Sequence, residues 1–95
     1  EVDASIPIRF SLEQNYPNPF NPSTKINYAL SSNQFVKLKV FNSLGEEVET
    51  IVNEFQDAGT HSKLYIINSV LPSGIYFYRL QAGDFVETKK MILLK

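Results

Sequence analysis

Hydrophobic and polar residues alternate along most of the chain. Ile26, Tyr28 and Leu30 alternate with smaller or more polar residues, and the segment Val36 to Val40 places lysines between its three aliphatic residues. Successive side chains of a β-strand point to opposite faces, so this period of two predicts strands with one dry face and one wet face. The same alternation predicts further strands around Leu64 and Ile66, from Tyr76 to Ala82 and from Val86 to Leu94.

Glycine and proline separate these segments at intervals of roughly 10 residues, as in all-β domains. Gly83 and Asp84 stand between two alternating segments and predict a two-residue hairpin loop of type II′. The sequence from Asn42 to Gly45 predicts a second tight turn that ends in glycine. Six or seven short strands joined in this way predict an antiparallel β-sandwich with Greek-key connections, in the manner of immunoglobulin-like or fibronectin-like domains.

The segment from Glu46 to Phe55 is ambiguous. Its apolar residues Val48, Ile51, Val52 and Phe55 follow the i, i+3, i+4, i+7 spacing of an amphipathic helix. The segment is short, has no clear N-cap and lies between predicted strands. We therefore expect a strand for its first part and keep the helix as the alternative.

The composition argues against catalysis. The 95 residues contain no cysteine and one histidine, His61, so disulfides and thiolate sites are excluded, and zinc sites and catalytic triads lose most of their usual ligands and bases. Asp57 and Asp84 stand beside or near glycine in predicted turns, where aspartate serves backbone hydrogen bonding. We expect no enzyme activity, no metal or cofactor, and no small-molecule substrate.

Charge is small in total and uneven along the chain. The net charge of −1 gives no reason to expect nucleic acid as a partner, but residues 1–62 carry −4 and residues 63–95 carry +3. Lys89, Lys90 and Lys95 lie in the last predicted strand, which we expect at a sheet edge, and they are our candidates for contact with a partner. The alternative is that these lysines only protect the edge against aggregation.

The segment from Leu12 to Thr24 contains three prolines, Pro17, Pro19 and Pro22, which make it stiff and non-helical. We expect Tyr16 and Phe20 to be buried and to anchor this segment on an open end of the sandwich. The alternative is that this proline-rich segment is itself a ligand that docks into an aromatic groove of a partner. Tyr76 and Tyr78 are expected in the core, with an exposed sugar-stacking face as their alternative.

Five blocks of the chain together resemble the type A C-terminal sorting domain of the type IX secretion system. The blocks run from Leu12 to Thr24, Val40 to Val48, Ala58 to His61, Leu71 to Leu80 and Lys89 to Lys95. They contain the residues that we expect to form the structural motif: Tyr16, Pro17, Pro19, Phe20, Gly45, Gly74, Tyr76 and Tyr78. The resemblance covers roughly residues 11–95, and an immunoglobulin-like domain of the flagellar hook-capping protein is the nearest related family. The segment from Leu64 to Val70 departs from the pattern, because the family more often has a tryptophan-like aromatic followed by a polar turn there.

The resemblance implies a non-catalytic targeting function. Residues 1–10 are then the end of a linker from an upstream passenger protein, and residues 11–95 are the sorting domain. Such domains bring their passengers from the periplasm across the outer membrane of bacteria with two membranes, to the cell surface or the medium. Their partners are the attached passenger and the secretion machinery. The alternative function is a passive immunoglobulin-like module for adhesion or carbohydrate binding.

Overall fold

Strands form where the sequence alternates. The computed structural model describes residues 6–68 and 70–95, and within these residues the chain forms seven β-strands. They are β1 (Ser11–Leu12), β2 (Ser23–Leu30), β3 (Gln34–Phe41), β4 (Glu47–Gln56), β5 (Gly59–Ile66), β6 (Gly74–Ala82) and β7 (Phe85–Leu93).

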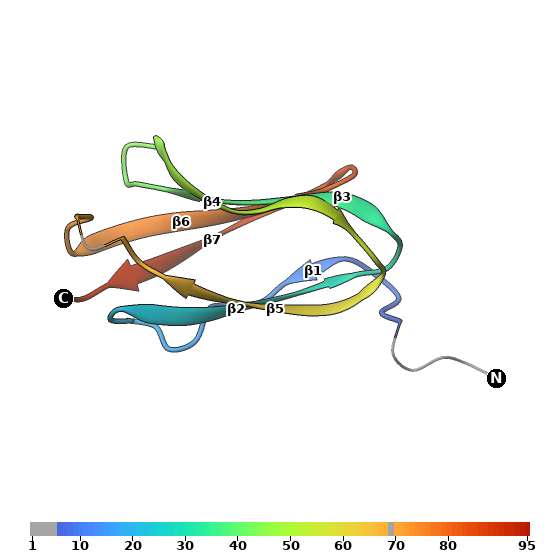
Figure 1. Cartoon of the computed structure of the whole chain (residues 1–95), viewed down its shortest axis with the longest axis horizontal. Helices are drawn as coiled ribbons and strands as arrows, with labels where there is room; N and C mark the ends of the chain where they lie inside the picture. The colour runs from blue at the N-terminus through green and yellow to red at the C-terminus, as the bar shows by residue number, and fades with distance from the viewer. Residues whose placement is uncertain (1–5, 69) are drawn as a thin grey trace.

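The strands are arranged in two antiparallel sheets that pack face to face (Figure 1). One sheet has the order β1-β2-β5 and the other has the order β4-β3-β6-β7. The chain crosses between the sheets after β2, after β4 and again after β5, so that β3 and β6, which are distant in sequence, become hydrogen-bonded neighbours. The predicted all-β antiparallel sandwich is confirmed.

The core lies between the two sheets and consists of the inward side chains of the predicted alternating segments. Ile26, Tyr28 and Leu30 of β2 and the three aliphatic residues of β3 are all 0–1% exposed. Removing such side chains from water contributes about 1.5–3 kcal/mol each, which makes their burial the main stabilising term of the sandwich.

In β5 the prediction chose the wrong face. Leu64 and Ile66 are 63% and 60% exposed, whereas Tyr65 and Ile67 are buried. The sequence Leu64 to Ile67 is apolar throughout, so alternation alone does not define which pair points inward. Pairing decides it, because Tyr65 lies opposite Thr24, a buried residue of β2.

The ambiguous segment forms strand β4, and its helix-like spacing has a structural cause. The pairing of β4 with β3 shifts register twice, between Leu38 and Lys39 and between Val40 and Phe41. At each shift β4 contains one extra residue, Ile51 and Val48 respectively. These β-bulges interrupt the period of two, so that Val48, Ile51 and Val52 all pack against the core, whereas Phe55 is exposed.

Both predicted turns are confirmed. Gly83 has a φ of 60° in the two-residue loop between Ala82 and Phe85, and Asp84 has no positive φ, as a type II′ turn requires. At the other turn, Gly45 has a φ of 85° and its N–H donates to the carbonyl oxygen of Asn42 at 3.0 Å.

The expected linker, residues 1–10, is described only in part, because residues 1–5 lie outside the described residues. Phe10 packs against the core and stacks on Phe85 of β7, with 5.7 Å between the ring centroids. Among the described residues no helix is long and apolar enough to cross a membrane.

Candidate recognition surface

The proline-rich segment lies along one side of the sandwich and connects the two sheets. We call residues 13–22 the strap. Tyr16 and Lys25 of β2 exchange two backbone hydrogen bonds, at 3.0 and 2.8 Å. Phe20 bonds to β7: its N–H donates to the carbonyl oxygen of Ile92 at 2.9 Å, and the N–H of Leu94 donates to its carbonyl oxygen at 3.0 Å. The strap therefore covers the outer edge of β7 along the second half of that strand.

A buried polar network holds the beginning of the strap. Asn15 is 2% exposed, and its side-chain amide donates to Thr24 Oγ1 at 3.0 Å. The Tyr78 hydroxyl accepts from the N–H of Asn15 at 2.8 Å and donates to the carbonyl oxygen of Glu13 at 2.8 Å. Burial raises the pKa of Tyr78 to about 12, so its hydroxyl stays protonated and able to donate at alkaline as well as neutral pH.

Only one of the two expected aromatic anchors is buried. Phe20 is 2% exposed, and its ring centroid lies 6.4 Å from that of Tyr65. Tyr16 is 79% exposed, so the prediction that its ring is buried is wrong. Its bridge partner Lys25 is exposed on the outer side of β2, and residues directly opposite each other in an antiparallel pair point to the same side.

Tyr76 and Tyr78 contribute to the core and present no sugar-stacking face. Their side chains are 3% and 0% exposed. The Tyr76 hydroxyl donates to the carbonyl oxygen of Pro72 at 2.6 Å, close to Gly74, where β6 begins. Burial also raises the pKa of Tyr76 above its usual value.

The three candidate lysines do not form one strip. Lys89 lies opposite the buried Tyr78 and Lys90 lies opposite Phe77, so the two side chains leave β7 on opposite faces. Lys89 Nζ is 3.3 Å from Glu87 Oε2. Lys95 follows the end of β7, and its backbone N–H donates to Ser73 Oγ at 2.9 Å. Lys89 and Lys90 therefore do not share a face, and the contact of these lysines with a partner stays a prediction.

The edge itself is also less accessible than the sequence suggested. Gln14 Nε2 donates to the carbonyl oxygen of Lys90 at 2.7 Å, and Asn18 Oδ1 accepts from the N–H of Ile92 at 2.9 Å. These bonds add to those of Phe20, so the strap occupies the backbone groups that a partner strand would otherwise use.

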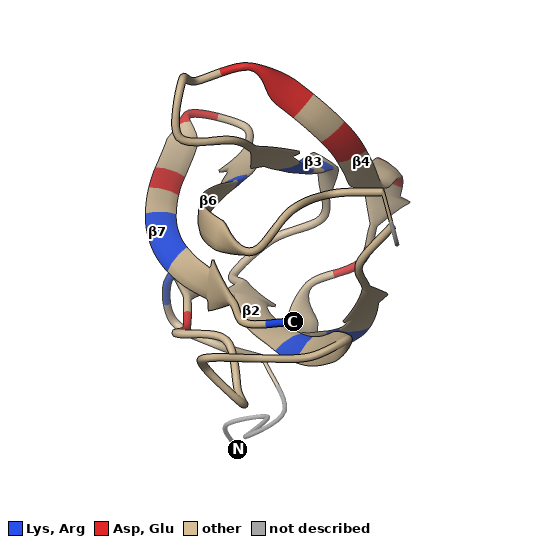
Figure 2. Cartoon of the chain, turned by 90° about the vertical axis from the view of Figure 1, so that its left-hand side faces the viewer, with Lys and Arg blue, Asp and Glu red and all other residues tan. Residues whose placement is uncertain are grey.

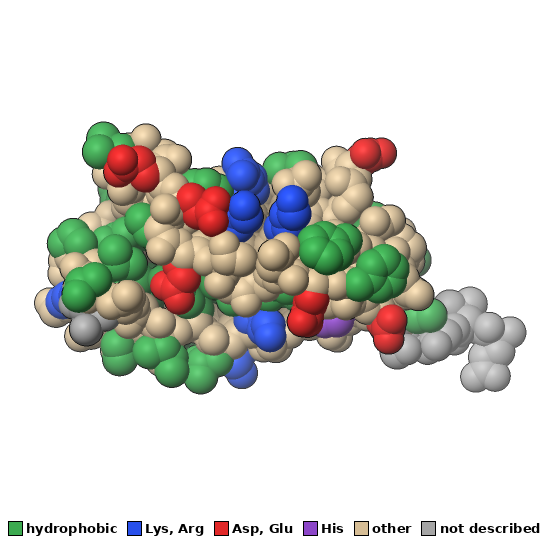
Figure 3. All heavy atoms as spheres, turned by 45° about the horizontal axis from the view of Figure 1, so that its top comes forward, with side chains coloured by type: hydrophobic (Ala, Val, Ile, Leu, Met, Phe, Trp, Pro, Cys, Tyr) green, Lys and Arg blue, Asp and Glu red, His purple; other side chains and the backbone are tan. Residues whose placement is uncertain are grey.

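The structure groups basic residues elsewhere, on the outer face of the four-stranded sheet. Lys37 and Lys39 of β3, Arg79 of β6 and Lys90 of β7 all point away from the core, and we call this surface the cationic face. Figure 3 shows Lys and Arg side chains gathered on this side of the molecule, with hydrophobic side chains beside them. Sequence alternation places Lys37 and Lys39 on a wet face, but it does not reveal the strand order that adds Arg79 and Lys90.

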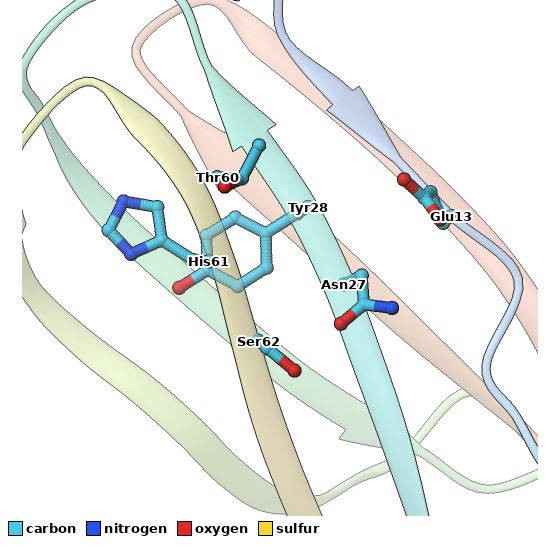
Figure 4. Close-up of a pocket in the computed structure, with 6 residues that line it drawn as sticks. All are labelled: Glu13, Asn27, Tyr28, Thr60, His61 and Ser62. Atoms are coloured by element: carbon cyan, nitrogen blue, oxygen red, sulfur yellow. The ribbon is translucent and has the colours of Figure 1, made fainter. Parts of the chain in front are cut away.

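A hollow lies on the three-stranded sheet. It has a volume of about 270 Å³ and is lined by Glu13, Asn27, Tyr28, Thr60, His61 and Ser62 (Figure 4). The His61 ring stacks on Tyr28, with centroids 5.2 Å apart, and its Nε2 lies 2.8 Å from the carbonyl oxygen of Asp57. In Figure 4, Glu13 and the His61 ring lie on opposite sides of the paired strands. Within the described part of the chain, no group of three or more His, Cys, Asp or Glu side chains is placed to hold a metal ion.

Comparison with known proteins agrees with the arrangement of these segments. The family model for the secretion system C-terminal sorting domain matches residues 14–94, which run from the strap to the end of the last strand. No curated protein and no solved structure matches the chain. Because the family model covers most of the 95 residues, the chain belongs to the family of type IX secretion system C-terminal sorting domains.

Proposed function

We propose that this domain directs an attached passenger protein from the periplasm across the outer membrane through the type IX secretion system. The family match over residues 14–94 carries this proposal. The passenger is joined at the N-terminal side, with residues 1–10 as the end of its linker. The domain contributes recognition without catalysis, and the passenger reaches the cell surface or the medium.

The arrangement of the family-like blocks supports recognition of a folded domain. The block from Leu12 to Thr24 and the block from Lys89 to Lys95 stand at opposite ends of the sequence, yet Asn18 and Ile92, which are 74 residues apart, are hydrogen-bonded. A linear signal would need no such pairing. The surface that combines both blocks exists only after folding, so we propose that the machinery reads the closed sandwich.

The proposal is tested by fusing residues 1–95 to a fluorescent protein that is directed to the periplasm. In a bacterium with the secretion machinery, we expect fluorescence on the cell surface or in the medium. In a strain without the machinery, the fusion stays in the periplasm. The reporter without the domain is the control and stays in the periplasm of both strains.

Equal retention of the fusion in both strains contradicts the proposal. An adhesion or carbohydrate-binding module gives this result, because its location does not depend on the machinery.

A further inference from the structure

The cationic face is built by the register of three neighbouring strands. Lys39 of β3 lies directly opposite Arg79 of β6, and Lys37 stands two residues before Lys39 on the same face. Lys90 of β7 lies opposite Phe77, the next outward residue of β6 before Arg79. Lys39 and Arg79, which are directly opposed, are about 4.5–5.5 Å apart at Cβ, and Lys90 is the diagonal neighbour of Arg79 at about 7–8 Å, so the cations are neighbours on one face.

This face is strongly positive although the whole chain carries −1. Glu49, Glu54 and Glu87 lie opposite Val40, Val36 and Leu80, three buried residues, and therefore leave their strands on the other face. In Figure 2, acidic residues mark β4, basic residues mark β3, and β7 has both.

Within the face, little compensates this positive charge. Lys39 Nζ lies 3.2 Å from Glu47 Oε1, and the Arg79 guanidinium lies 4.6 Å from the centroid of the Phe41 ring. In the described part of the chain, Lys37 and Lys90 have no ion pair. Like charges directly opposite each other destabilise a sheet, and the contacts with Glu47 and Phe41 offset this cost for Lys39 and Arg79.

Aromatic residues flank the cations on both sides. Phe35 of β3 and Phe55 of β4 are directly opposite each other and are 47% and 64% exposed. Beside Phe35, a hollow of about 250 Å³ is lined by Gln34, Phe35, Lys37, Gln81 and Gly83. At the other end, Phe41 and Phe77 are neighbours across β3 and β6. Along β3 the outward residues thus run aromatic, cation, cation, aromatic.

We propose that the cationic face docks an extended acidic polypeptide segment with apolar side chains at either end of its acidic residues. Outward residues of β3 repeat every two positions, about 6.8 Å, and an extended peptide presents alternate side chains at the same spacing. Carboxylates of such a segment pair with Lys37 and Lys39, and one apolar end enters the hollow beside Phe35. An anionic glycan complements the charges but offers no alternating apolar side chain for that hollow.

This inference rests on the proposed function and names the surface by which a component of the secretion machinery holds the domain. Charge complementarity of this kind sets specificity and the rate of encounter more than total affinity. The binding is therefore expected to weaken as salt screens the exposed charges.

A titration followed by NMR tests the docking. The probe is a short synthetic peptide in which glutamate and threonine alternate between terminal leucines, added to the 95-residue chain. We expect shifts of the backbone signals of residues 35–41 and of Arg79 and Lys90. The double variant Lys37→Glu/Lys90→Glu is expected to bind about tenfold more weakly.

A matched control uses the same change of charge away from the face. Arg9 and Lys25 are exposed and lie outside the four-stranded sheet, so Arg9→Glu/Lys25→Glu is expected to bind within about twofold of the original chain. Thermal unfolding of both double variants confirms that each is folded before its affinity is compared.

Equal affinity of the original chain and Lys37→Glu/Lys90→Glu overturns the inference. So does a result in which an anionic oligosaccharide gives the shifts and the peptide gives none. In the export assay, normal export of the folded Lys37→Glu/Lys90→Glu fusion overturns the inference and leaves the proposed function intact. Failure of the original fusion to be exported at all overturns the proposed function instead.

Discussion

The two open sides of the sandwich are closed in different ways. On one side, the strap forms main-chain hydrogen bonds with both β2 and β7 and inserts Phe20 between the sheets. On the other side, between β4 and β5, closure depends on side chains. The Tyr65 hydroxyl donates to Glu49 Oε1 at 2.9 Å, and the Tyr28 hydroxyl donates to Gln56 Oε1.

The difference determines how each strand edge is protected. The strap supplies partners for the backbone of β7 through the main chain of Phe20 and the side chains of Gln14 and Asn18, and the Phe20 ring anchors it. In the part of the chain that the structure describes, no segment forms such bonds with the edges of β4 and β5. Strand β4 has two bulges and several carboxylates, and β5 has Lys63 opposite the buried Ile26, so a charge points inward at its edge. Bulges and inward charges are known means of blocking strand addition.

The largest effect is expected on the strap side. Replacing Phe20 with alanine leaves a cavity between the sheets and detaches the anchor of the strap. We expect Phe20→Ala to lower the free energy of unfolding by about 4 kcal/mol, measured by denaturant unfolding. Tyr16→Ala is the control, because its ring is 79% exposed, and it is expected to change the free energy by less than about 0.5 kcal/mol. Equal losses for the two variants contradict the assignment of Phe20 as the anchor.

Alkaline pH is expected to lower the stability of the sandwich through a buried tyrosine on each of its two sides. Burial raises the pKa values of Tyr78, on the strap side, and Tyr28, on the opposite side, from 10.0 to about 12. The folded state holds these protons more tightly than the unfolded chain does. The two tyrosines therefore contribute fully to the free energy of unfolding below pH 10. This contribution, about 2 kcal/mol per tyrosine, is lost as the pH rises through about 12.

The measurement is the free energy of unfolding between pH 9 and pH 12. Tyr78→Phe and Tyr28→Phe are each expected to make the alkaline decline shallower, because each removes one tyrosine whose pKa is raised by burial. An unchanged slope for either variant excludes that hydroxyl from the pH dependence.

The smallest effect is expected where closure depends on a partly solvated side-chain bond. Tyr65→Phe keeps the buried ring and removes the donor to Glu49, so we expect a loss of about 1 kcal/mol. Glu49→Gln keeps an acceptor oxygen and is expected to cost less. If Tyr65→Phe leaves the free energy of unfolding unchanged, packing alone closes this side.

The alternating segments were sufficient to predict most of the fold, because a period of two assigns one face to the core wherever polar residues mark the other. Alternation gave the wrong inward face in β5, because the sequence Leu64 to Ile67 contains no polar residue to mark which side chains point outward. It was ambiguous in β4 because a bulge is a property of the pairing between two strands. Neither the partner strand nor its register is visible in the segment itself.

The candidate surface was predicted less well. Lys89 and Lys90 are adjacent in a strand, so their opposite directions follow from strand geometry and were available from the sequence. The burial of Phe20 was predicted correctly, but the exposure of Tyr16 was not, because it depends on the pairing of Tyr16 with β2. The cationic face depends on the strand order β3-β6-β7, which joins Lys37 and Lys39 to residues about 40–50 positions away along the chain.

The pairing of the strap with β7 also limits the order in which the chain can fold. Gln14 and Lys90 are 76 residues apart, so their hydrogen bond closes a loop that includes almost the whole domain. Contacts of such long sequence separation are formed late, because the entropy of loop closure is lost before they become favourable. On a ribosome, residues up to Leu94 must emerge before Phe20 obtains both of its backbone partners. We therefore expect the nascent domain to remain incomplete until synthesis has passed its last strand, and then to close in a single late step.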